Sequence, residues 1–253
     1  MLDTGARATL AATRFGDVTW VAEVGSTNDE VMVRARAGAV EGVVVVADRQ
    51  IAGRGRRGRT WEAPAGSSLL VSVLLRPAAA HRAVVACGLA AVDACWAAAG
   101  VDATLKWPND LLVDGHGKLA GILAEAAEAA VGGDADGHGG DGPAVVVGLG
   151  LNVDWGDAAL PLGGTSLAAI GQAGVDRVTL LVAYLVALED RCRQPLGVLM
   201  ADYRAACSTI GRQVRVDLPG GTSFAGRATE VDDDGRLIVD GRAVAAADVV
   251  HLR

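Results

Sequence analysis

Three runs of apolar, β-forming residues constrain the fold of this chain more than any other feature of its sequence. They are VVVVA at 43–47, SSLLVSVLL at 67–75 and AVVVGLGLNV at 144–153. The first is typical of a fully buried strand, and the second is typical of another strand. The third belongs with ATLKW, DLLV and GKLAGILAEA to what we interpret as neighbouring strands of one sheet.

Helical patterns lie between and after these strands. Thr27 and Glu30 have the spacing of a capping box, so we expect a helix from Thr27 to about Gly38. An apolar helical face extends from about 78 to 99, and a largely helical region covers about 178–206 with an interruption near Pro195. Together the strands and helices predict an α+β fold for most of the chain.

The sequence changes character after Thr209. The segments QVRVDL, TSFAGRATEV, GRLIVD and ADVVHL are rich in β-forming residues and are separated by PGG and DDDG turns. Short strands at this spacing predict a small SH3-like β-barrel. We therefore expect two domains, at 1–207 and 208–253, with a boundary near Cys207.

Composition excludes some classes of function. The chain has 253 residues, 51% of them hydrophobic, and a net charge of −7, which argues against a general binder of nucleic acid or anionic membranes. No signal peptide is visible, and the most apolar stretch, at 83–100, is interrupted by Asp93. The four cysteines have no C-x-x-C spacing, which fits free thiols in a reducing cytoplasm.

Positive charge is concentrated in GRGRRGRTW at 53–61, where four arginines fall within six positions among glycines. The glycines match G-x-G-x-x-G formally, but no helix pattern follows, so we reject a dinucleotide fingerprint. A Walker A loop is excluded because no Gly-Lys-Ser/Thr ends the run. Two interpretations stay open: a solvated surface loop, or a loop whose arginines bind an anion and which is mobile until that anion orders it. Trp61 would offer a stacking face for adenine.

A second polar cluster lies in LKWPNDLLVDGHGKLAGILAE at 105–125. Asn109 and Asp110 follow a proline at a strand edge, and Lys118 opens a nearly uncharged strand. Lys118 either extends to solvent at a sheet edge or binds a phosphate, and Asp110 is a candidate magnesium ligand. In GLGLN at 148–152, Asn152 ends a strand and the glycines would admit a ligand closely.

The motifs GSTN at 25–28, GRGRRGRTW, KWPND at 106–110, GKLAGIL at 117–123 and GLGLN occur in the order and spacing of biotin protein ligases. The chain resembles that family over roughly 21–153, and the C-terminal barrel fits it as well. The resemblance implies a mixed sheet with helices packed on it. It also implies an activity: biotin and ATP form biotinyl-5′-AMP, and biotin then passes to a lysine of a carrier domain in an acyl-CoA carboxylase.

The resemblance also implies roles for individual residues. The predicted biotin-binding residues are Ser26, Thr27, Asn28, Gln50, Arg54, Gly55, Arg56, Lys118 and Gly121. The predicted ATP-binding residues are Arg54, Arg59, Trp61, Asn109, Lys118 and Asn152. The predicted catalytic residues are Lys118, Arg56 and Asp110, with Asp110 also the expected Mg²⁺ ligand.

Two alternatives remain beside this interpretation: a lipoate or octanoate ligase, and a non-catalytic binding module. About twenty residues precede the first motif strand, which is too few for a winged helix, so we expect a monofunctional enzyme that does not bind DNA or membranes. We further expect a monomer or weak dimer. The segment GGDADGHGGDG at 132–142 could suggest a metal site through Asp134, Asp136, His138 and Asp141, but its spacing fits no calcium loop, and we interpret it as a flexible acidic hairpin tip.

Overall fold

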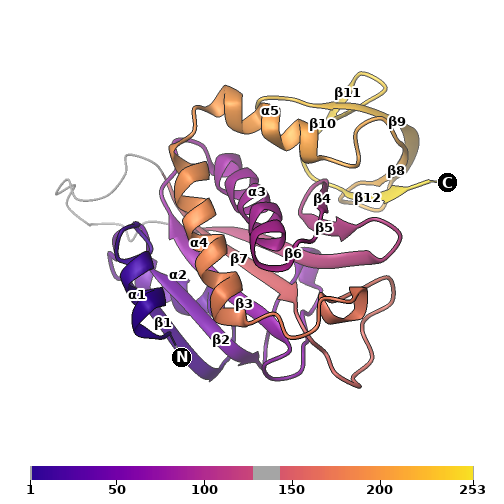
Figure 1. Cartoon of the computed structure of the whole chain (residues 1–253). Helices are drawn as coiled ribbons and strands as arrows, with labels where there is room; N and C mark the ends of the chain where they lie inside the picture. The colour runs from indigo at the N-terminus through magenta and orange to yellow at the C-terminus, as the bar shows by residue number, and fades with distance from the viewer. Residues whose placement is uncertain (1, 128–142, 253) are drawn as a thin grey trace.

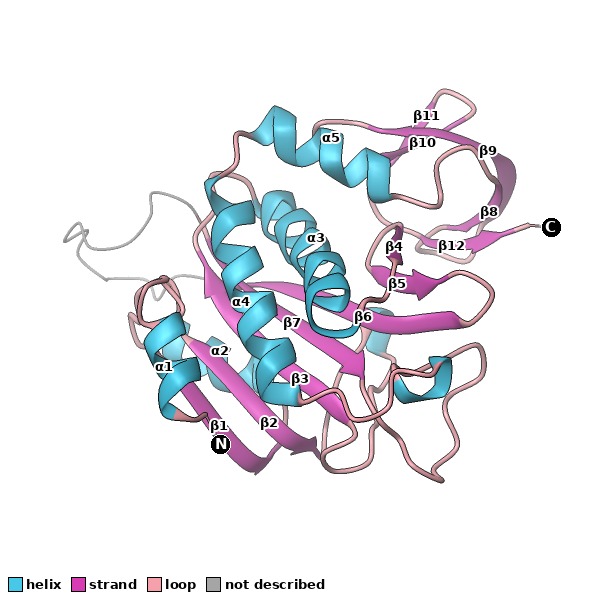
Figure 2. Cartoon of the chain, viewed as in Figure 1, coloured by secondary structure: helices cyan, strands magenta, loops and turns pink. Residues whose placement is uncertain are grey.

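The computed structural model describes residues 2–127 and 143–252. Within these residues, seven strands form one sheet in the order β1-β2-β3-β7-β6-β5-β4 (Figure 2). The predicted hairpin tip at 132–142 and its acidic residues lie outside the described part. The strands are β1 Val18–Val24, β2 Val44–Gln50, β3 Ser68–Leu75, β4 Ala103–Lys106, β5 Asp110–Val113, β6 Gly117–Ala127 and β7 Ala144–Asn152.

The sheet is mixed, as expected. β1 and β2 run parallel, whereas the other neighbouring pairs run antiparallel. The three apolar runs form β2, β3 and β7 at its centre, and every residue of β3 is buried. Strands buried on both faces need apolar residues at successive positions, which explains why these runs do not alternate with polar residues.

Helices cover both faces of the sheet (Figure 1). α3 (Ala80–Ala99) and α4 (Arg177–Arg193) pack together on one face, where their apolar residues join those of β3 and β7 in one core. α2 (Thr27–Arg36) packs on the other face, against Val45, Leu74 and Val146. α5 (Leu196–Ala206) follows α4 after Pro195, which confirms the predicted interruption. Two short 3₁₀ turns, η1 (Arg56–Gly58) and η2 (Ala168–Ile170), lie in loops.

α2 begins at Thr27, as predicted, but the predicted capping box of Thr27 and Glu30 is wrong. The N-cap residue is Ser26, and its side chain makes no cap hydrogen bond. Thr27 is instead the first helical residue, and its hydroxyl lies 3.0 Å from Gln50 Oε1 and 2.7 Å from Ser72 Oγ. A side chain with tertiary partners on neighbouring strands is not available to cap its own helix.

A short N-terminal helix, α1 (Thr4–Leu10), was not assigned from the sequence. Asp3 caps it by accepting a hydrogen bond from the Ala6 N–H at 2.7 Å, and the helix packs on α4 through Leu10. With only seven residues, its apolar periodicity is too short to be distinguished from a loop.

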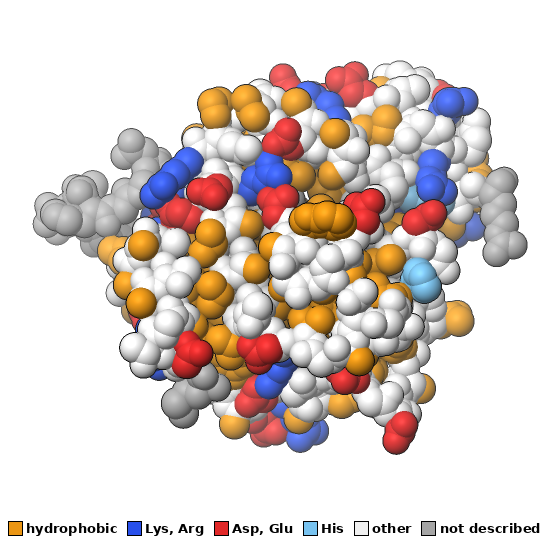
Figure 3. Space-filling view, in the orientation of Figure 1, with side chains coloured by type: hydrophobic (Ala, Val, Ile, Leu, Met, Phe, Trp, Pro, Cys, Tyr) orange, Lys and Arg blue, Asp and Glu red, His pale blue; other side chains and the backbone are white. Residues whose placement is uncertain are grey.

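α3 is long and apolar enough to span a membrane when judged by length and composition alone. In this fold it is a core helix, because 56% of its most apolar window is buried inside the protein. The outer face formed by α3 and α4 carries acidic and basic side chains interspersed with apolar ones (Figure 3). No field of a single charge sign extends over this view of the surface.

The C-terminal part forms a second, antiparallel sheet in the order β11-β10-β9-β8-β12. Its strands are β8 Gln213–Asp217, β9 Ser223–Val231, β10 Leu237–Val239, β11 Arg242–Val244 and β12 Asp248–His251. The expected strands are present, but in the described residues no pairing joins β11 to β12, so the predicted barrel is an open sheet rather than a closed one.

The two sheets are joined by backbone and side-chain hydrogen bonds next to β4. The Ser208 N–H donates to Leu105 O at 2.7 Å, and the Trp107 N–H donates to Thr209 Oγ1 at 3.0 Å. The Trp107 ring N–H reaches Gly235 O at 3.0 Å. These contacts place the edge of the C-terminal sheet beside the KWPND segment, while the division at 207/208 stays a prediction.

Candidate active site

A cavity of about 310 Å³ lies between the larger sheet and the C-terminal sheet. Its walls come from the start of α2, the end of β2, the arginine loop at 53–61, the β4–β5 turn, the middle of β6 and β7, and β12. All the predicted site residues except Asn152 line it: Ser26, Thr27, Asn28, Gln50, Arg54, Gly55, Arg56, Arg59, Trp61, Asn109, Asp110, Lys118 and Gly121. Five motifs that are distant in the sequence therefore converge on one cavity.

The α2 end of the cavity is polar and uncharged. The Thr27 N–H donates to Gln50 Oε1 at 2.7 Å, and the Asn28 amide donates to Glu125 Oε2 at 2.7 Å. Both Thr27 and Asn28 are buried. Gly148 leaves room for this arrangement, since a Cβ at that position would lie 2.3 Å from Asn28 Oδ1.

The opposite end carries cations. Lys118 Nζ lies 2.6 Å from Asp110 Oδ1 and 5.5 Å from the centre of the Trp61 ring. The Trp61 ring rests on β7 at Gly150, where a Cβ would come within 2.6 Å of Cε2. The Trp61 ring N–H is buried and has no hydrogen-bond partner among the described residues. An ammonium held between a carboxylate and an aromatic face is well placed to receive an added anion.

The glycines of GLGLN therefore serve a purpose that the sequence did not indicate. We expected them to admit a ligand, but the space above Gly148 holds the Asn28 side chain and the space above Gly150 holds the Trp61 ring. The small residues allow two cavity-lining side chains to lie directly on the sheet.

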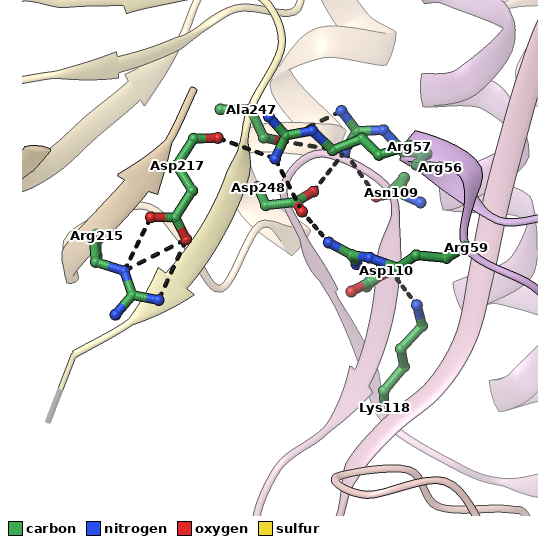
Figure 4. Close-up of polar contacts among 10 residues, drawn as sticks. All are labelled: Arg56, Arg57, Arg59, Asn109, Asp110, Lys118, Arg215, Asp217, Ala247 and Asp248. Atoms are coloured by element: carbon green, nitrogen blue, oxygen red, sulfur yellow. Dashed lines mark hydrogen bonds and ion pairs between the residues drawn. The ribbon is translucent and has the colours of Figure 1, made fainter. Parts of the chain in front are cut away.

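The arginine loop closes over the cavity and contacts the C-terminal sheet (Figure 4). The Arg57 guanidinium lies 3.2 Å from Asp248 Oδ2, and Arg59 pairs with the same carboxylate. Arg56 donates to Asn109 Oδ1 at 3.2 Å and to the Ala247 carbonyl at 3.3 Å. The carboxylate of Asp248, in the C-terminal part of the same chain, is therefore the anion that the loop arginines bind in this structure.

Burial has an electrostatic consequence at Arg56. Loss of hydration lowers the pKa of its guanidinium, and the neighbouring charges of Arg57 and Arg59 lower it further. The carboxylates of Asp248 and Asp110 act in the opposite direction. Arginine stays protonated throughout, so the effect is an unfavourable free energy that an additional anion in the cavity would relieve.

At the base of the loop, Arg54 lies between two carboxylates. Its guanidinium donates to Glu125 Oε2 at 2.9 Å and to Asp29 Oδ1 at 2.5 Å. Because Glu125 also accepts from Asn28, it links the loop to the polar end of the cavity. Glu125 was not singled out from the sequence, although a lone acid in the apolar segment GILAE was a usable signal.

Asn152 is placed differently from the other predicted residues. It is buried, its amide donates to the Thr165 carbonyl at 2.9 Å, and Ser68 Oγ lies 3.4 Å from its Oδ1. Asn152 therefore fixes the segment that precedes η2 and does not line the cavity. Its predicted contact with adenosine stays a prediction.

Further lining residues were missed because they come from the C-terminal part. Asp217, Asp248, Val249 and Val250 line the cavity, with Asp248 at the centre of the arginine contacts. Nothing in the segment ADVVHL distinguishes Asp248 from a surface acid, and only the docking of the two sheets brings it to the loop.

Comparisons with known proteins agree on one group of proteins. Residues 26–133 match the biotin/lipoate A/B protein ligase family, and residues 209–252 match the biotin protein ligase C-terminal domain. The chain is 43% identical over 249 residues to the biotin–(acetyl-CoA carboxylase) ligase of Mycobacterium tuberculosis, covering 92% of this chain and 88% of that protein.

Solved structures are similar as well. The biotin protein ligase of Aquifex aeolicus in complex with biotin and ATP aligns with a TM-score of 0.77 at 22% identity, over 94% of this chain and 100% of the other. The biotin protein ligase of Leishmania major in complex with biotinyl-5-AMP aligns with a TM-score of 0.61 at 25% identity, over 94% of this chain and 98% of the other.

Proposed function

The chain belongs to the biotin protein ligase family, and from this premise we propose that its cavity joins biotin to ATP and passes the biotin to a lysine of a biotin carboxyl carrier domain of an acyl-CoA carboxylase. Relatives named for this activity support the proposal over lipoate ligation. The observation that carries it is the cavity itself, whose lining is polar and uncharged at Ser26, Thr27, Asn28 and Gln50 and holds the basic side chains of Lys118 and Arg56, each beside a carboxylate, at the other end.

The two ends match the two ends of biotin. Its uncharged, hydrogen-bonding ring system would lie at the start of α2, against Ser26, Thr27, Asn28 and Gln50. Its carboxylate would then point toward Lys118 and Arg56, beneath Gly55 and beside Gly121. The nucleotide would lie along Arg59, Trp61 and Asn109, where a guanidinium, an aromatic face and an amide are available.

In the first step, a carboxylate oxygen of biotin attacks the α-phosphorus of ATP. A carbon–oxygen–phosphorus linkage forms, the bond to the bridging oxygen of the β-phosphate breaks, and pyrophosphate leaves. Two anions must approach each other, so fixed cations at the point of attack lower the barrier most. Lys118 and Arg56 are assigned to that position as the catalytic residues.

In the second step, the amine of a carrier lysine attacks the acyl carbon, and AMP leaves. The substrates supply both nucleophiles, so the chain needs cations and a closed cavity rather than a nucleophile of its own. The arginine loop would exclude water and so protect the mixed anhydride from hydrolysis.

Magnesium would enter with the nucleotide. In the described residues, no group of three or more His, Cys, Asp or Glu side chains forms a metal site. Magnesium typically takes one or two protein carboxylates and fills its other positions with water and phosphate oxygens. Asp110, beside Lys118, fits the role of that carboxylate, and the ion would neutralise charge on the leaving pyrophosphate.

The test is pyrophosphate release from ATP in the presence of biotin, of lipoate, or of neither. We expect release only with biotin, and incorporation of biotin into a purified carrier domain when that domain is added. Release that is equally fast with lipoate, or that requires no acid, would contradict the proposal.

A further inference from the structure

Lys106, the first residue of the KWPND motif, is a second lysine of the cavity. The chain contains two lysines, Lys106 and Lys118, and both line the cavity. Lys118 is paired with Asp110 at 2.6 Å. Within residues 2–127 and 143–252, by contrast, the half-buried Lys106 side chain makes neither a hydrogen bond nor an ion pair. Its ammonium therefore keeps all three of its donors for a ligand.

The carboxylates of the cavity are already neutralised by other cations. Three acidic residues line it, namely Asp110, Asp217 and Asp248. Asp110 pairs with Lys118, Asp217 pairs with Arg215 at 3.1 Å, and Asp248 pairs with arginines of the loop. The positive charge of Lys106 is thus left without a counter-charge among the described residues, so an anionic ligand would supply it.

The alternation of β4 directs Lys106 toward the cavity. Ala103 and Leu105 are buried on one face, where Leu105 lies against Gly88 of α3. Successive side chains of a strand point to opposite faces of the sheet. Lys106 therefore points away from α3 and toward the face on which the cavity lies.

The register of the sheet places Lys106 at the end of a row of residues. Lys106 pairs with Asp110, Asp110 with Gly121, and Gly121 with Gly150. Directly paired residues of antiparallel strands share a face and lie about 5 Å apart. Lys118 Nζ lies over the middle of the row, 3.1 Å from the position that a Cβ of Gly121 would take. Lys106 ends the row on β4, the edge strand.

The uncharged end of the cavity lies on the opposite side of Lys118. Asn28 contacts Ser72 on β3 and lies above Gly148 on β7. In the strand order β3-β7-β6-β5-β4, Lys118 on β6 separates these residues from Lys106 on β4. A ligand that extends from Asn28 across the sheet reaches Lys118 first and Lys106 afterwards.

The geometry of phosphoryl transfer gives this order a meaning. The attacking and leaving oxygens lie roughly in line on opposite sides of the phosphorus. In the proposed first step, the biotin carboxylate reaches the α-phosphorus at Lys118 from the uncharged side. The pyrophosphate then leaves on the other side, toward β4, and gains negative charge as its bond to phosphorus breaks. A fixed cation at that position stabilises the transition state.

We propose that Lys106 is a further catalytic residue, whose ammonium binds the β- and γ-phosphates of ATP and the leaving pyrophosphate. The inference rests on the proposed function and assigns Lys106 to its first step only. In the second step the carrier amine displaces AMP, pyrophosphate has already left, and Lys106 has no phosphate of the leaving group to bind.

The test separates the two steps. Exchange of labelled pyrophosphate into ATP in the presence of biotin gives KM for pyrophosphate, and transfer from purified biotinyl-5′-AMP to a carrier domain reports the second step alone. In Lys106→Met, KM for pyrophosphate should rise about tenfold to a hundredfold, the effect of one charge-assisted contact. The rate of transfer and KM for biotin should be unchanged.

A second variant distinguishes charge from packing. Lys106→Arg keeps the positive charge, so its KM for pyrophosphate should stay closer to the wild-type value than that of Lys106→Met. A merely structural role of the Lys106 stem would instead lower the melting temperature and slow exchange and transfer alike.

The matched control is Arg212→Gln. Burial lowers the pKa of His251 to about 4, and the charges of Lys106 and Arg212 lower it further, so both cations lie near this residue of β12. Arg212 does not line the cavity, and its Nε donates to Ser208 O at 2.9 Å. Arg212→Gln thus removes a positive charge from the same region, and KM for pyrophosphate should stay at the wild-type value.

Three results would overturn the inference. They are a wild-type KM for pyrophosphate in Lys106→Met, an equal rise of that KM in Arg212→Gln, and transfer that slows in Lys106→Met as much as exchange does. If Lys106→Met does not fold, Lys106→Gln carries the same comparison. Wild-type protein that catalyses no exchange with biotin would instead remove the proposed function itself.

Discussion

The contact between the arginine loop and Asp248 predicts that the C-terminal sheet helps to hold the loop closed before any substrate binds. Asp248 pairs with Arg57 at 3.2 Å and with Arg59, and its Oδ1 lies 3.9 Å from Arg56. The change Asp248→Asn keeps the shape of the side chain and removes the charge. Three arginines would then lose their shared counter-charge.

The size of the effect follows from exposure. The Asp248 side chain is 21% exposed, and those of its arginine partners range from 23% to 65%. Half-exposed pairs contribute about 0.2–1 kcal/mol each, so three of them stabilise closure by roughly 1–2 kcal/mol. At about 1.4 kcal/mol per decade, the open population should rise roughly fivefold to thirtyfold.

Limited trypsin digestion measures this population, since trypsin cleaves after the loop arginines when the loop opens. In low salt, cleavage within 53–61 should accelerate in Asp248→Asn by the factor given above, and added salt should shrink the difference by screening the wild-type pairs. Biotin with ATP should slow cleavage in both proteins, because the bound anion replaces Asp248 as a partner.

The control is Asp233→Asn, which removes the same charge from the C-terminal part at a residue that pairs with Arg204 and not with the loop. It should digest like the wild type. Equal cleavage of wild type and Asp248→Asn in low salt would refute the idea that this carboxylate holds the loop.

Three further predictions concern single side chains. Lys118→Ala should abolish pyrophosphate release while the melting temperature stays near that of the wild type. Lys118→Arg should restore little of that release, since a planar guanidinium does not replace the ammonium that lies 2.6 Å from Asp110. Near-normal release by Lys118→Ala would contradict the catalytic role of Lys118. Arg56→Gly should still form the adenylate but release it about tenfold to a hundredfold faster. The release is measured as biotin incorporated into albumin. Labelling of albumin no faster than by the wild type would exclude a role of Arg56 in retaining the adenylate. Burial, with the charges of nearby basic residues, lowers the pKa of His251 from 6.5 to about 4, and its Nε2 pairs with Thr209 Oγ1. Between these pH values the unfolded chain binds a proton that the folded chain does not, so the melting temperature should fall as the pH drops from 6.5 to about 4. The fall should be less steep in His251→Gln. Parallel curves of melting temperature against pH for the two proteins would contradict this role of His251.

The strands were predictable because their pattern is local. Runs such as 69–75, which is apolar at every position except Ser72, have the pattern that a strand covered on both faces requires, and the structure places that run near the sheet centre. The cavity residues were predictable for a related reason. Four of the five motifs bring polar side chains to one cavity from within a few residues of a strand or helix end, and GLGLN lines it through Gly148, Leu149 and Gly150.

Two details could not be predicted from the local sequence pattern. Ser68 pairs opposite Asn152 in the register of β3 and β7, and this pairing draws Asn152 into the protein rather than toward the cavity. Gly148 admits the Asn28 side chain rather than a ligand. A short stretch of sequence contains neither the residues of the partner strand nor the side chain that fills the space above a glycine.

The sequence by itself determined the α+β elements, the family resemblance and the set of side chains available to bind an acid and a nucleotide, because all of these depend on residues close together in the chain. Only the tertiary structure decided how those side chains are paired. Asp248 reaches the arginine loop, and Ser72 reaches Thr27, across contacts between elements that are distant in sequence. Such pairing depends on distances of about 3 Å between these elements, and those distances exist only once the chain has folded.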